Sequence, residues 1–441
     1  MNKGILKNIL KGVLVFILVI IAFISLLYLT SLIPTKYLEK NVKESANILL
    51  NESNRKKVYI PYKNITMQFD NYTDALMINT AYSIDTSTPL YSVFTAKKNY
   101  IPNITKTIQQ DSVSELKSAS KYKYHNEVGE LYDTANNNIE ESFEYARYWH
   151  GYLIFLRPML AIFNINVIRI IAITIFAILG MILFALLLKK FSIYTAIFFI
   201  IGLIGVEYFY IGISLQGMFV FFISLITSIY ILIREDKIKS ICMCFFMVGM
   251  FTNFLDFLTV PIVTYGIPLT IYFLIQQKER NLTYKEIIII FMKTGITWFL
   301  GYSITWVTKW ALMDIMYERN LIEVSLGQVM YRSTGNGANY SYLKVLFNNL
   351  YYVIVPLFIN TFIAFFIEIF NKKSKINNPI NQKIPYIIIS IIPFVWYSIL
   401  KNHSLNHAFF TYRNLVLTII TIPIAMIDFR FLYHNCRDNI K

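Results

Sequence analysis

The amino-acid sequence predicts an all-α polytopic membrane protein with about ten transmembrane helices and a mainly helical external domain between the first and second spans. Composition is the first observation behind this prediction. Of the 441 residues, 56% are hydrophobic and only 15% are charged, whereas a soluble domain carries about 25% charged residues. The second observation is the repetition of apolar runs of about 20 residues. The third is that lysine and arginine cluster between alternate runs.

The net charge of +15 does not indicate a nucleic-acid partner, because its placement follows the membrane pattern described below. Cys242 and Cys244 lie inside an apolar run, and Cys436 is in the C-terminal tail. None of the three has a cysteine partner in the large polar segment, so no disulfide framework is expected. The Cys242–Cys244 pair lacks neighbouring His or acidic ligands and is interpreted as lipid- or core-facing.

Residues 1–33 form the first span. Lys3, Lys7 and Lys11 precede an apolar run from Val13 to Ile33. A signal peptide has an apolar core of about 7–15 residues and a small-residue cleavage site, and this run is longer and lacks such a site. The run is therefore predicted to be an uncleaved span whose lysine-bearing end is cytoplasmic.

Residues 34–165 are expected outside the cell as a small, mainly helical domain resting on the membrane. Leu38, Val42, Ala46 and Leu49 follow helical spacing within residues 36–55. Further helices are predicted at 112–123 and 134–148, and a short β element at 58–62. The bounds of this domain follow from its polar composition between two apolar runs.

Residues 166–441 are predicted to form a multi-span domain with external loops at 309–344 and 401–413. A single crossing by each span puts the basic groups between alternate spans on the side of the N-terminus, so both termini are expected in the cytoplasm and the protein in the cell membrane. Pro261 and Pro268 predict a broken or re-entrant pair. The expected spans are 165–188, 191–211, 214–233, 241–258, 260–276, 287–308, 345–370, 384–400 and 411–430.

The stretch Glu144–Pro158, EYARYWHGYLIFLRP, lies where the polar domain meets the apolar chain. Its Tyr and Trp residues suit a membrane interface. Arg147, His150 and Arg157 add positive or protonatable groups at the same level. This combination suits the binding of an anionic group attached to a lipid. The alternative is an ordinary aromatic belt with arginines that extend to the headgroups.

A second candidate is the stretch 68–81, QFDNYTDALMINTA, in the external domain. Asp70 and Asp74 are four residues apart and share one face of a helix. Either carboxylate could act as a general base on an acceptor hydroxyl, and the two together could hold a divalent cation. The alternative is helix capping by Asp70 or Thr73 ahead of an apolar run. Asp74 precedes that run directly and is the preferred base.

The third candidate is the segment HSLNHAFFTYR, with His403, His407 and Arg413. The i, i+4 spacing of the histidines can bind a metal, but no acidic residue of an H-E-x-x-H motif lies between them, so no metal site is assigned. A cradle for phosphate, with Arg413 as a bidentate donor, is the favoured interpretation. Simple positioning at the interface is the alternative.

The expected loop 309–344 carries Lys309, Arg319 and Arg332. Lys309 is included among the residues expected to bind an anionic substrate, although charges on such a loop are usually only solvated. Glu207 and Asp256 are the acids nearest to span interiors, and acids in such positions are functional candidates. Both lie near the outer ends of spans, which favours a site at the external interface. No nucleotide-binding or serine-hydrolase motif is present, and no organic cofactor is expected.

The layout resembles the GT-C class of membrane glycosyltransferases. Those enzymes have a first span, a large external loop with an acidic residue, many further spans and a second external loop. The segments DNYTDALM, RYWHGYLIFLRP, GYSITWVTKW and NHSLNHAFFTYR also resemble segments of multi-pass proteins from low-GC Gram-positive bacteria. The resemblance covers most of the chain as architecture and few residues as motif.

This resemblance implies transfer of a sugar from a polyprenyl-phosphate donor in the lipid bilayer. The acceptor would be an extracytoplasmic polysaccharide, such as a cell-wall polymer, or a glycolipid. Two other classes remain open. A transporter or flippase of lipid-linked saccharide would need ionisable groups or broken helices near mid-membrane. A non-catalytic scaffold or sensor would use residues 34–165 to bind partners and needs no clustered acids and bases.

Overall fold

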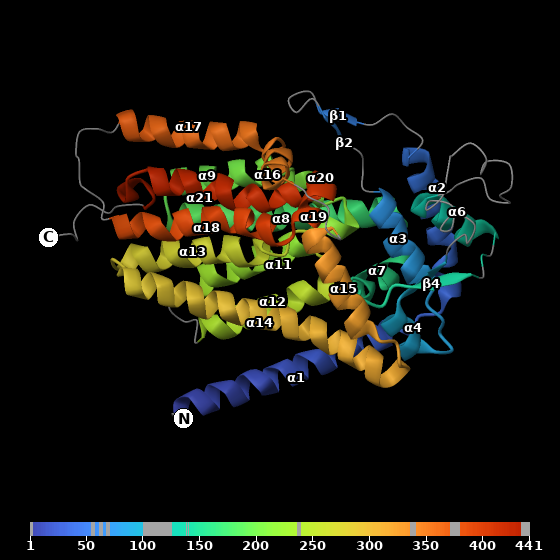
Figure 1. Ribbon diagram of the computed structural model, residues 1–441. Helices are drawn as coiled ribbons and strands as arrows, with labels where there is room; N and C mark the ends of the chain where they lie inside the picture. Colours follow the sequence, from blue (N-terminus) through green and yellow to red (C-terminus); the bar gives the residue numbers. More distant parts are fainter. Residues whose placement is uncertain are drawn as a thin grey trace.

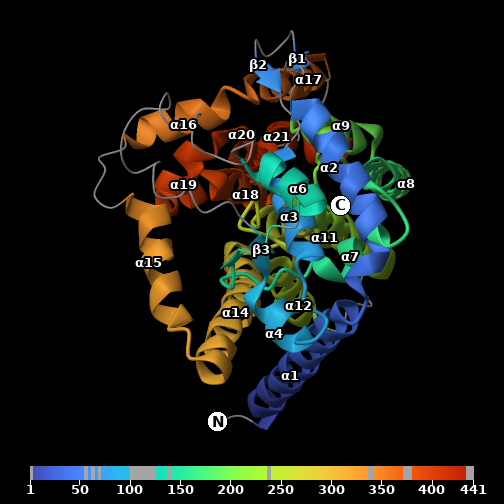
Figure 2. The same cartoon turned by 90° about the vertical axis from the view of Figure 1, so that its right-hand side faces the viewer.

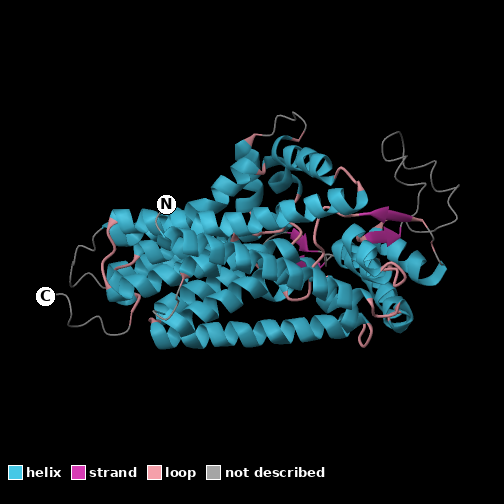
Figure 3. Cartoon of the chain, turned by 90° about the horizontal axis from the view of Figure 1, so that it is seen from below, coloured by secondary structure: helices cyan, strands magenta, loops and turns pink. Residues whose placement is uncertain are grey.

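The structure, a computed structural model, describes residues 3–53, 58–60, 65–67, 71–99, 126–137, 139, 141–235, 240–335, 341–370 and 380–433. Helices make up nearly all of the described chain (Figure 3). Six of the described helices are long and apolar enough to cross a membrane, or seven if one bent pair counts as a single span. The protein is thus a multi-pass helical membrane protein, as the composition predicted.

The bundle consists of long helices that run alongside one another (Figure 1). The helices that pack most closely are α12 and α14. A Cβ atom on Gly249 would lie 2.1 Å from the Trp298 carbonyl oxygen, and one on Gly301 would lie 2.1 Å from the Phe246 carbonyl oxygen. The two glycines therefore allow the helix backbones to touch. The bundle helices are α1 (Lys3–Ser31), α8 (Ile165–Lys190), α9 (Ile193–Gly205), α11 (Leu215–Arg234), α12 (Ile241–Leu255), α13 (Val263–Glu279), α14 (Tyr284–Tyr317), α17 (Ile354–Phe370), α18 (Ile380–Ile399) and α21 (Val416–Met426).

One end of the bundle, here called the terminal end, carries the start of α1 and the end of α21 (Figure 1). Lys190 at the end of α8 forms a 2.7 Å ion pair with Glu235, and its carbonyl accepts a 3.1 Å hydrogen bond from Lys278 of α13. Lys190 and Lys278, two of the basic residues expected on the side of the N-terminus, therefore meet at this end. The opposite end is called the domain end.

The domain end is covered by the described residues between 35 and 160, which Figure 2 shows face on. The amphipathic helix expected at 36–55 is present as α2, and it buries Val42, Ala46 and Leu49. Two antiparallel pairs of strands accompany the helices, with Val58 opposite Met67 and Lys97 opposite Glu144. The elements are η1 (Thr35–Tyr37), α2 (Glu39–Ser53), β1 (Val58–Ile60), β2 (Ile65–Met67), α3 (Asn71–Tyr82), α4 (Pro89–Thr95), β3 (Lys97–Asn99), α6 (Glu127–Asn137), β4 (Ser142–Glu144) and α7 (Leu153–Leu160).

Some expected elements differ from the structure. The helix predicted at 134–148 is wrong: α6 ends at Asn137, and the chain then pairs as β4 with β3. The aromatic rings of 145–149 follow no helical register because they serve contacts with other helices, described below. The helix expected at 112–123 lies outside the described residues.

The segment 309–344 is helical over most of its described length and is no open loop. α14 continues to Tyr317 because apolar and aromatic residues, Trp310 and Met313 among them, still bury one face there. α15 and α16 follow, and α16 and α17 meet at a bend of 72°. The segment 401–413 also forms short helices. The remaining elements are α10 (Tyr208–Ile211), α15 (Leu321–Thr334), α16 (Tyr342–Leu350), α19 (Lys401–Asn406), α20 (Ala408–Thr411), η5 (Tyr412–Leu415) and η6 (Phe429–Phe431).

Candidate functional site

The aromatic stretch 144–158 is hydrogen-bonded to the domain ends of α12 and α14. The indole N–H of Trp149 donates a 2.8 Å hydrogen bond to the Thr305 carbonyl in α14. In return, Trp306 and Trp310 of α14 both donate to the carbonyl of Arg147, at 2.9 and 3.0 Å. Three indole N–H groups therefore join the backbone of this stretch to α14 through main-chain carbonyls. The side chain of Arg147 takes no part in these hydrogen bonds.

Gly151 brings the same stretch against the end of α12. Its N–H donates a 2.9 Å hydrogen bond to the Phe254 carbonyl. A Cβ atom at this position would lie 2.5 Å from that carbonyl oxygen and from two ring atoms of Phe254. Any side chain would force the stretch away from α12, so the approach requires glycine.

His150 is a buried, neutral positioning residue. Its Nε2 lies 2.7 Å from the Tyr145 carbonyl, which can only accept, so Nε2 carries the proton. Nδ1 then accepts from the Tyr152 hydroxyl at 3.2 Å. Burial lowers the pKa of His150 to about 3, so the ring stays neutral at physiological pH. His150 also has a φ of 55°, which places its ring against Phe257 at 5.1 Å.

The loop 256–262 between α12 and α13 holds a buried carboxylate, Asp256. Its oxygens accept hydrogen bonds from the Thr259 N–H, at 3.1 and 3.0 Å, and from the Thr259 hydroxyl. Burial raises the pKa of Asp256 to about 6. No basic side chain of the described residues forms an ion pair with it. Asn253, one helical turn earlier on the same face, is also buried, and its Oδ1 has no hydrogen-bond partner in the described part of the chain.

The other side of this loop is held by His403 of α19. Its Nε2 lies 2.9 Å from the Leu258 carbonyl and must donate, so Nδ1 is an acceptor. Nδ1 receives a 3.0 Å hydrogen bond from Nη1 of Arg332 in α15. Burial and the nearby charge of Arg332 lower the pKa of His403 well below its ordinary value. The His407 ring lies 4.8 Å from that of His403.

Tyr148 is buried against Phe257 of this loop and Trp306 of α14, with ring centroids 5.2 and 5.9 Å apart. Burial raises the pKa of Tyr148 to about 12, the charges of Arg332 and Arg147 oppose that rise, and Asp256 adds to it. All three charges therefore act at one point. We call Arg147, Tyr148, Asp256, Arg332 and His403 the Arg332 cluster. Within the described residues neither arginine forms an ion pair with a carboxylate, so the cluster contains two guanidinium groups and one buried acid that are not ion-paired.

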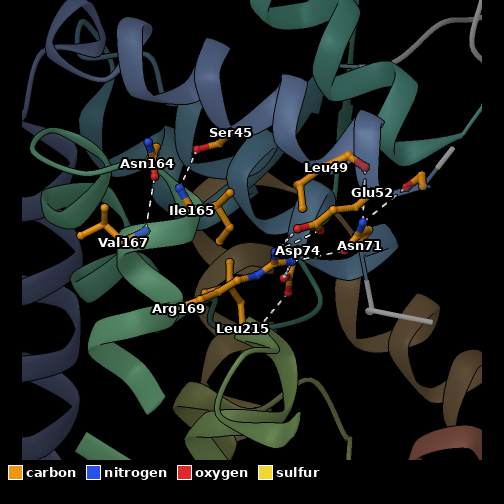
Figure 4. Close-up of polar contacts among 11 residues, drawn as sticks. Ser45, Leu49, Glu52, Asn71, Asp74, Asn164, Ile165, Val167, Arg169 and Leu215 are labelled. Atoms are coloured by element: carbon orange, nitrogen blue, oxygen red, sulfur yellow. Dashed lines mark hydrogen bonds and ion pairs between the residues drawn. The ribbon is translucent and has the colours of Figure 1, made fainter. Parts of the chain in front are cut away.

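Asp74 lies in a different network, between the domain and the bundle (Figure 4). It is fully buried in α3. Its Oδ2 accepts from Arg169 of α8 at 3.0 Å, and its Oδ1 accepts from the Leu215 N–H at the start of α11 at 2.9 Å. Arg169 also binds both carboxylate oxygens of Glu52, at 2.9 and 3.0 Å, and the amide oxygen of Asn71, at 3.2 Å. Because both oxygens of Asp74 are bound in this way, the geometry is that of an anchoring ion pair.

A second anchor lies beside it (Figure 4). The Ile165 N–H at the start of α8 donates to the Ser45 hydroxyl of α2 at 2.9 Å. Asn164 caps α8 through its Oδ1 and donates to Glu44 at 3.0 Å. α2 and α3 are therefore both fixed to α8. Asp70, the other expected carboxylate, lies outside the described residues.

The side chains of Arg157, Lys309 and Arg413 each make contacts outside the Arg332 cluster. The Arg157 guanidinium is fully buried and donates to the carbonyls of Ala81 and Ile33, which joins the ends of α3 and α1 to α7. Lys309 is also buried. Its ammonium donates to the Phe94 carbonyl at 2.6 Å and lies over the Phe94 ring, so it caps the last turn of α4.

Arg413 lies beside the break between α9 and α10. Its Nη2 is 3.9 Å from a carboxylate oxygen of Glu207, which also accepts a 2.7 Å hydrogen bond from the Tyr412 hydroxyl. The guanidinium of Arg413 thus has an acidic neighbour, unlike Arg332 and Arg147. Glu207 holds a φ of 63°, and these contacts stabilise that backbone turn.

The structure therefore brings together part of the expected site. His150 and His403 contact the loop 256–262, and His407 lies against His403. Arg147 belongs to the stretch whose Tyr148 packs on Phe257. Asp74, Arg157, Lys309 and Arg413 belong to four other contacts. Asp256 and Arg332 complete the cluster. The sequence signal was a charge near the outer end of a span for Asp256, and a charge on the expected loop 309–344 for Arg332. Across the described residues no group of three or more His, Cys, Asp or Glu side chains could hold a metal ion.

No family model, curated protein or solved structure matches this chain.

Proposed function

We propose that the protein is a membrane glycosyltransferase that moves a sugar from a polyprenyl-phosphate donor to an extracytoplasmic acceptor, such as a cell-wall polymer or a glycolipid. The observation that carries the proposal is the Arg332 cluster. It combines two arginines that lack an acidic partner among the described residues with a buried carboxylate of raised pKa, and all three charges affect Tyr148. Such a pairing suits an anionic leaving group next to a hydroxyl that must lose a proton.

In this proposal Arg332 and Arg147 bind the phosphate of the donor. His403 accepts from Arg332 and has no charge of its own, so it orients the guanidinium without neutralising it. Asp256 accepts the proton of the acceptor hydroxyl while that oxygen bonds to the anomeric carbon. The bond between the anomeric carbon and the phosphate oxygen breaks, and polyprenyl phosphate leaves with the electron pair. Asn253 accepts a hydrogen bond from a sugar hydroxyl through its Oδ1.

The proposal includes a ten-span arrangement of the GT-C kind, with both termini in the cytoplasm and the domain end outside the cell membrane. The bent pair α16–α17 supplies the seventh span. α9, α12 and α13, with 13, 15 and 17 residues, supply three more. At 1.5 Å per residue these helices are about 20–26 Å long, somewhat shorter than a typical hydrocarbon core. All three lie among the long helices (Figure 1).

A transfer assay tests the proposal. Membranes containing the protein are supplied with polyprenyl-phosphate donors that carry labelled sugars and with cell-wall or glycolipid acceptors. We expect Asp256→Asn to lower the rate by about 10²–10⁴-fold and Arg332→Gln to weaken donor binding. Arg280→Gln, which removes an exposed arginine at the terminal end, is the matched control and should leave transfer unchanged.

The variants also separate the alternatives. Full activity of Asp256→Asn, with none in Asp70→Asn, would place the base at Asp70 and contradict the role of Asp256. Movement of intact lipid-linked saccharide across the vesicle membrane, without sugar transfer, would support the flippase hypothesis. If neither sugar transfer nor lipid movement is observed with any donor, the scaffold or sensor hypothesis is favoured.

A further inference from the structure

A large apolar groove runs beside α1 and along α12 from Ser240 to Leu255. Its volume is about 1160 Å³, which exceeds the range of about 300–1,000 Å³ that is usual for small-molecule pockets. The walls come from α1, α7, α8, α11 and α12. They are formed almost entirely by apolar side chains, among them Phe23, Phe155, Ile175, Phe222, Met247 and Phe251.

The groove exists because α1 packs against the bundle only in its second half. Ile20, Phe23 and Leu27 are buried, whereas no residue with a described side chain before Ile20 is buried. Figures 1 and 2 both show the first turns of α1 diverging from the other helices. The large side chains of this half, such as Leu10, Leu14 and Leu18, are exposed. Within a membrane this space must be filled by hydrocarbon.

The charges along the groove identify its occupant. Of the residues that line it, only Lys11 and Arg234 are charged. Both are positive, and both lie toward the terminal end, near the start of α1 and at the end of α11. Neither forms an ion pair with another described residue. A smaller cavity that shares Leu26 and Phe155 with the groove continues toward Ile33 and Pro158, and no charged residue lines it.

We propose that this groove is a binding site for a glycerophospholipid with an anionic headgroup. The phosphate lies between Lys11 and Arg234, and the acyl chains fill the space between α1 and α12. The lipid holds the first half of α1 against the bundle. This site is separate from the proposed transferase site, because its charges are at the opposite end of the bundle, and it stands whether or not the protein transfers sugars.

The test is lipid retention by the purified, full-length protein. The protein is moved from nanodiscs that contain equal phosphatidylglycerol and phosphatidylcholine into mild detergent, and retained lipid is measured by native mass spectrometry. We expect selective retention of phosphatidylglycerol by the wild type. The double variant Lys11→Gln/Arg234→Gln should bind it about 30-fold more weakly, the loss expected for two basic contacts to an anionic headgroup.

Lys7→Gln/Lys189→Gln is the matched control, because it removes the same charge from α1 and α8 at residues that do not line the groove. It should retain phosphatidylglycerol like the wild type. Ile226→Trp fills the groove from α11 and should expel both lipids while the protein remains folded by circular dichroism. Equal retention of both lipids by the wild type, or equal losses in the two double variants, would overturn the headgroup site. Unchanged retention in Ile226→Trp would overturn the groove as the location.

Discussion

Nη1 of Arg332 lies 3.0 Å from Nδ1 of His403, and the opposite nitrogen of that ring is bound to the carbonyl of Leu258. Because the Leu258 carbonyl accepts from Nε2 of His403, the ring proton is on Nε2 and Nδ1 is an acceptor. Nδ1 in turn orients the Arg332 guanidinium. A main-chain loop between α12 and α13 therefore sets the direction of an arginine on α15.

This relay predicts that His403 acts through Arg332. His403→Ala should raise the KM for a polyprenyl-phosphate donor by about tenfold, the size of one lost charge-assisted hydrogen bond, with a smaller effect on kcat. Arg332→Lys should do the same, because an ammonium cannot reproduce the fork of donors. Steady-state kinetics would show the split. An equal fall in kcat for His403→Ala would mean that the ring itself takes part in the chemistry.

The proposed base predicts an acidic limb in the pH profile. The pKa of Asp256 is about 6, so the group is ionised and can accept a proton above pH 6 and is protonated below it. Transfer should therefore rise with pH through about 6. His150 and His403 have lowered pKa values and remain neutral across this range.

The stability of the fold has the opposite pH dependence to the transfer rate. The folded protein binds this proton more tightly than the unfolded chain, whose Asp titrates near 3.8, so protonation of Asp256 stabilises the fold as pH falls from 6 to about 4. Asp256→Asn should remove both dependences. Rate and denaturant midpoint measured from pH 4 to 8 would check them, and an unchanged acidic limb in the residual activity of the variant would contradict the assignment.

The Asp74–Arg169 pair predicts a loss of stability. Asp74→Asn should destabilise the protein by about 3 kcal/mol, because the buried Arg169 loses one of its two described carboxylate partners. Asp85→Asn removes an exposed turn carboxylate and is a suitable comparison, with a much smaller effect. Chemical denaturation in detergent would give both values. Had Asp74 been the base, its Asn variant would instead keep normal stability and lose transfer.

Gly151 predicts a steric effect. Gly151→Ala should lower stability by about 1–3 kcal/mol, since its Cβ atom would overlap Phe254. The same change should weaken donor binding, because Arg147 belongs to the displaced stretch. Gly327→Ala is a clean control, as nothing lies within 4 Å of a Cβ there. Equal behaviour of the two variants would show that the approach to α12 is dispensable.

The proposed orientation predicts opposite labelling of the two ends. With the native cysteines replaced, Lys43→Cys in α2 should react with an impermeant thiol reagent in intact cells, and Lys285→Cys at the terminal end should react only after permeabilisation. The Lys43 side chain is partly exposed and Lys285 is exposed in the folded protein. Equal labelling of both before permeabilisation would reject the orientation.

The bundle was largely predictable, because long apolar runs and the positions of basic residues are local signals. The span expected at 214–233 appears as α11 (Leu215–Arg234), and the one at 165–188 as α8 (Ile165–Lys190). The extension of α14 to Tyr317 was missed, since Lys309 in its interior marks an exposed loop by composition. Only the distant carbonyl of Phe94 makes that lysine tolerable in a buried position.

The site was less predictable for the same reason. Composition identified Arg147, Arg157 and Arg413 as equivalent candidates, but their roles depend on which carbonyls or carboxylates the fold brings to them. Arg157 meets two carbonyls from residues more than 70 positions away, and Arg413 meets Glu207. Arg332 meets a neutral histidine. No spacing within the sequence distinguishes these cases.

The indoles that fasten the 144–158 stretch have an optical consequence. The protein has five tryptophans, and Trp149, Trp298, Trp306 and Trp310 all lie along α14 or against it. Only Trp396, on α18, is elsewhere. Because indole emission shifts with local polarity, the intrinsic fluorescence of the protein reports mainly on the neighbourhood of Tyr148. Occupation of that neighbourhood is therefore visible in the unmodified chain, without a label or an assay of turnover.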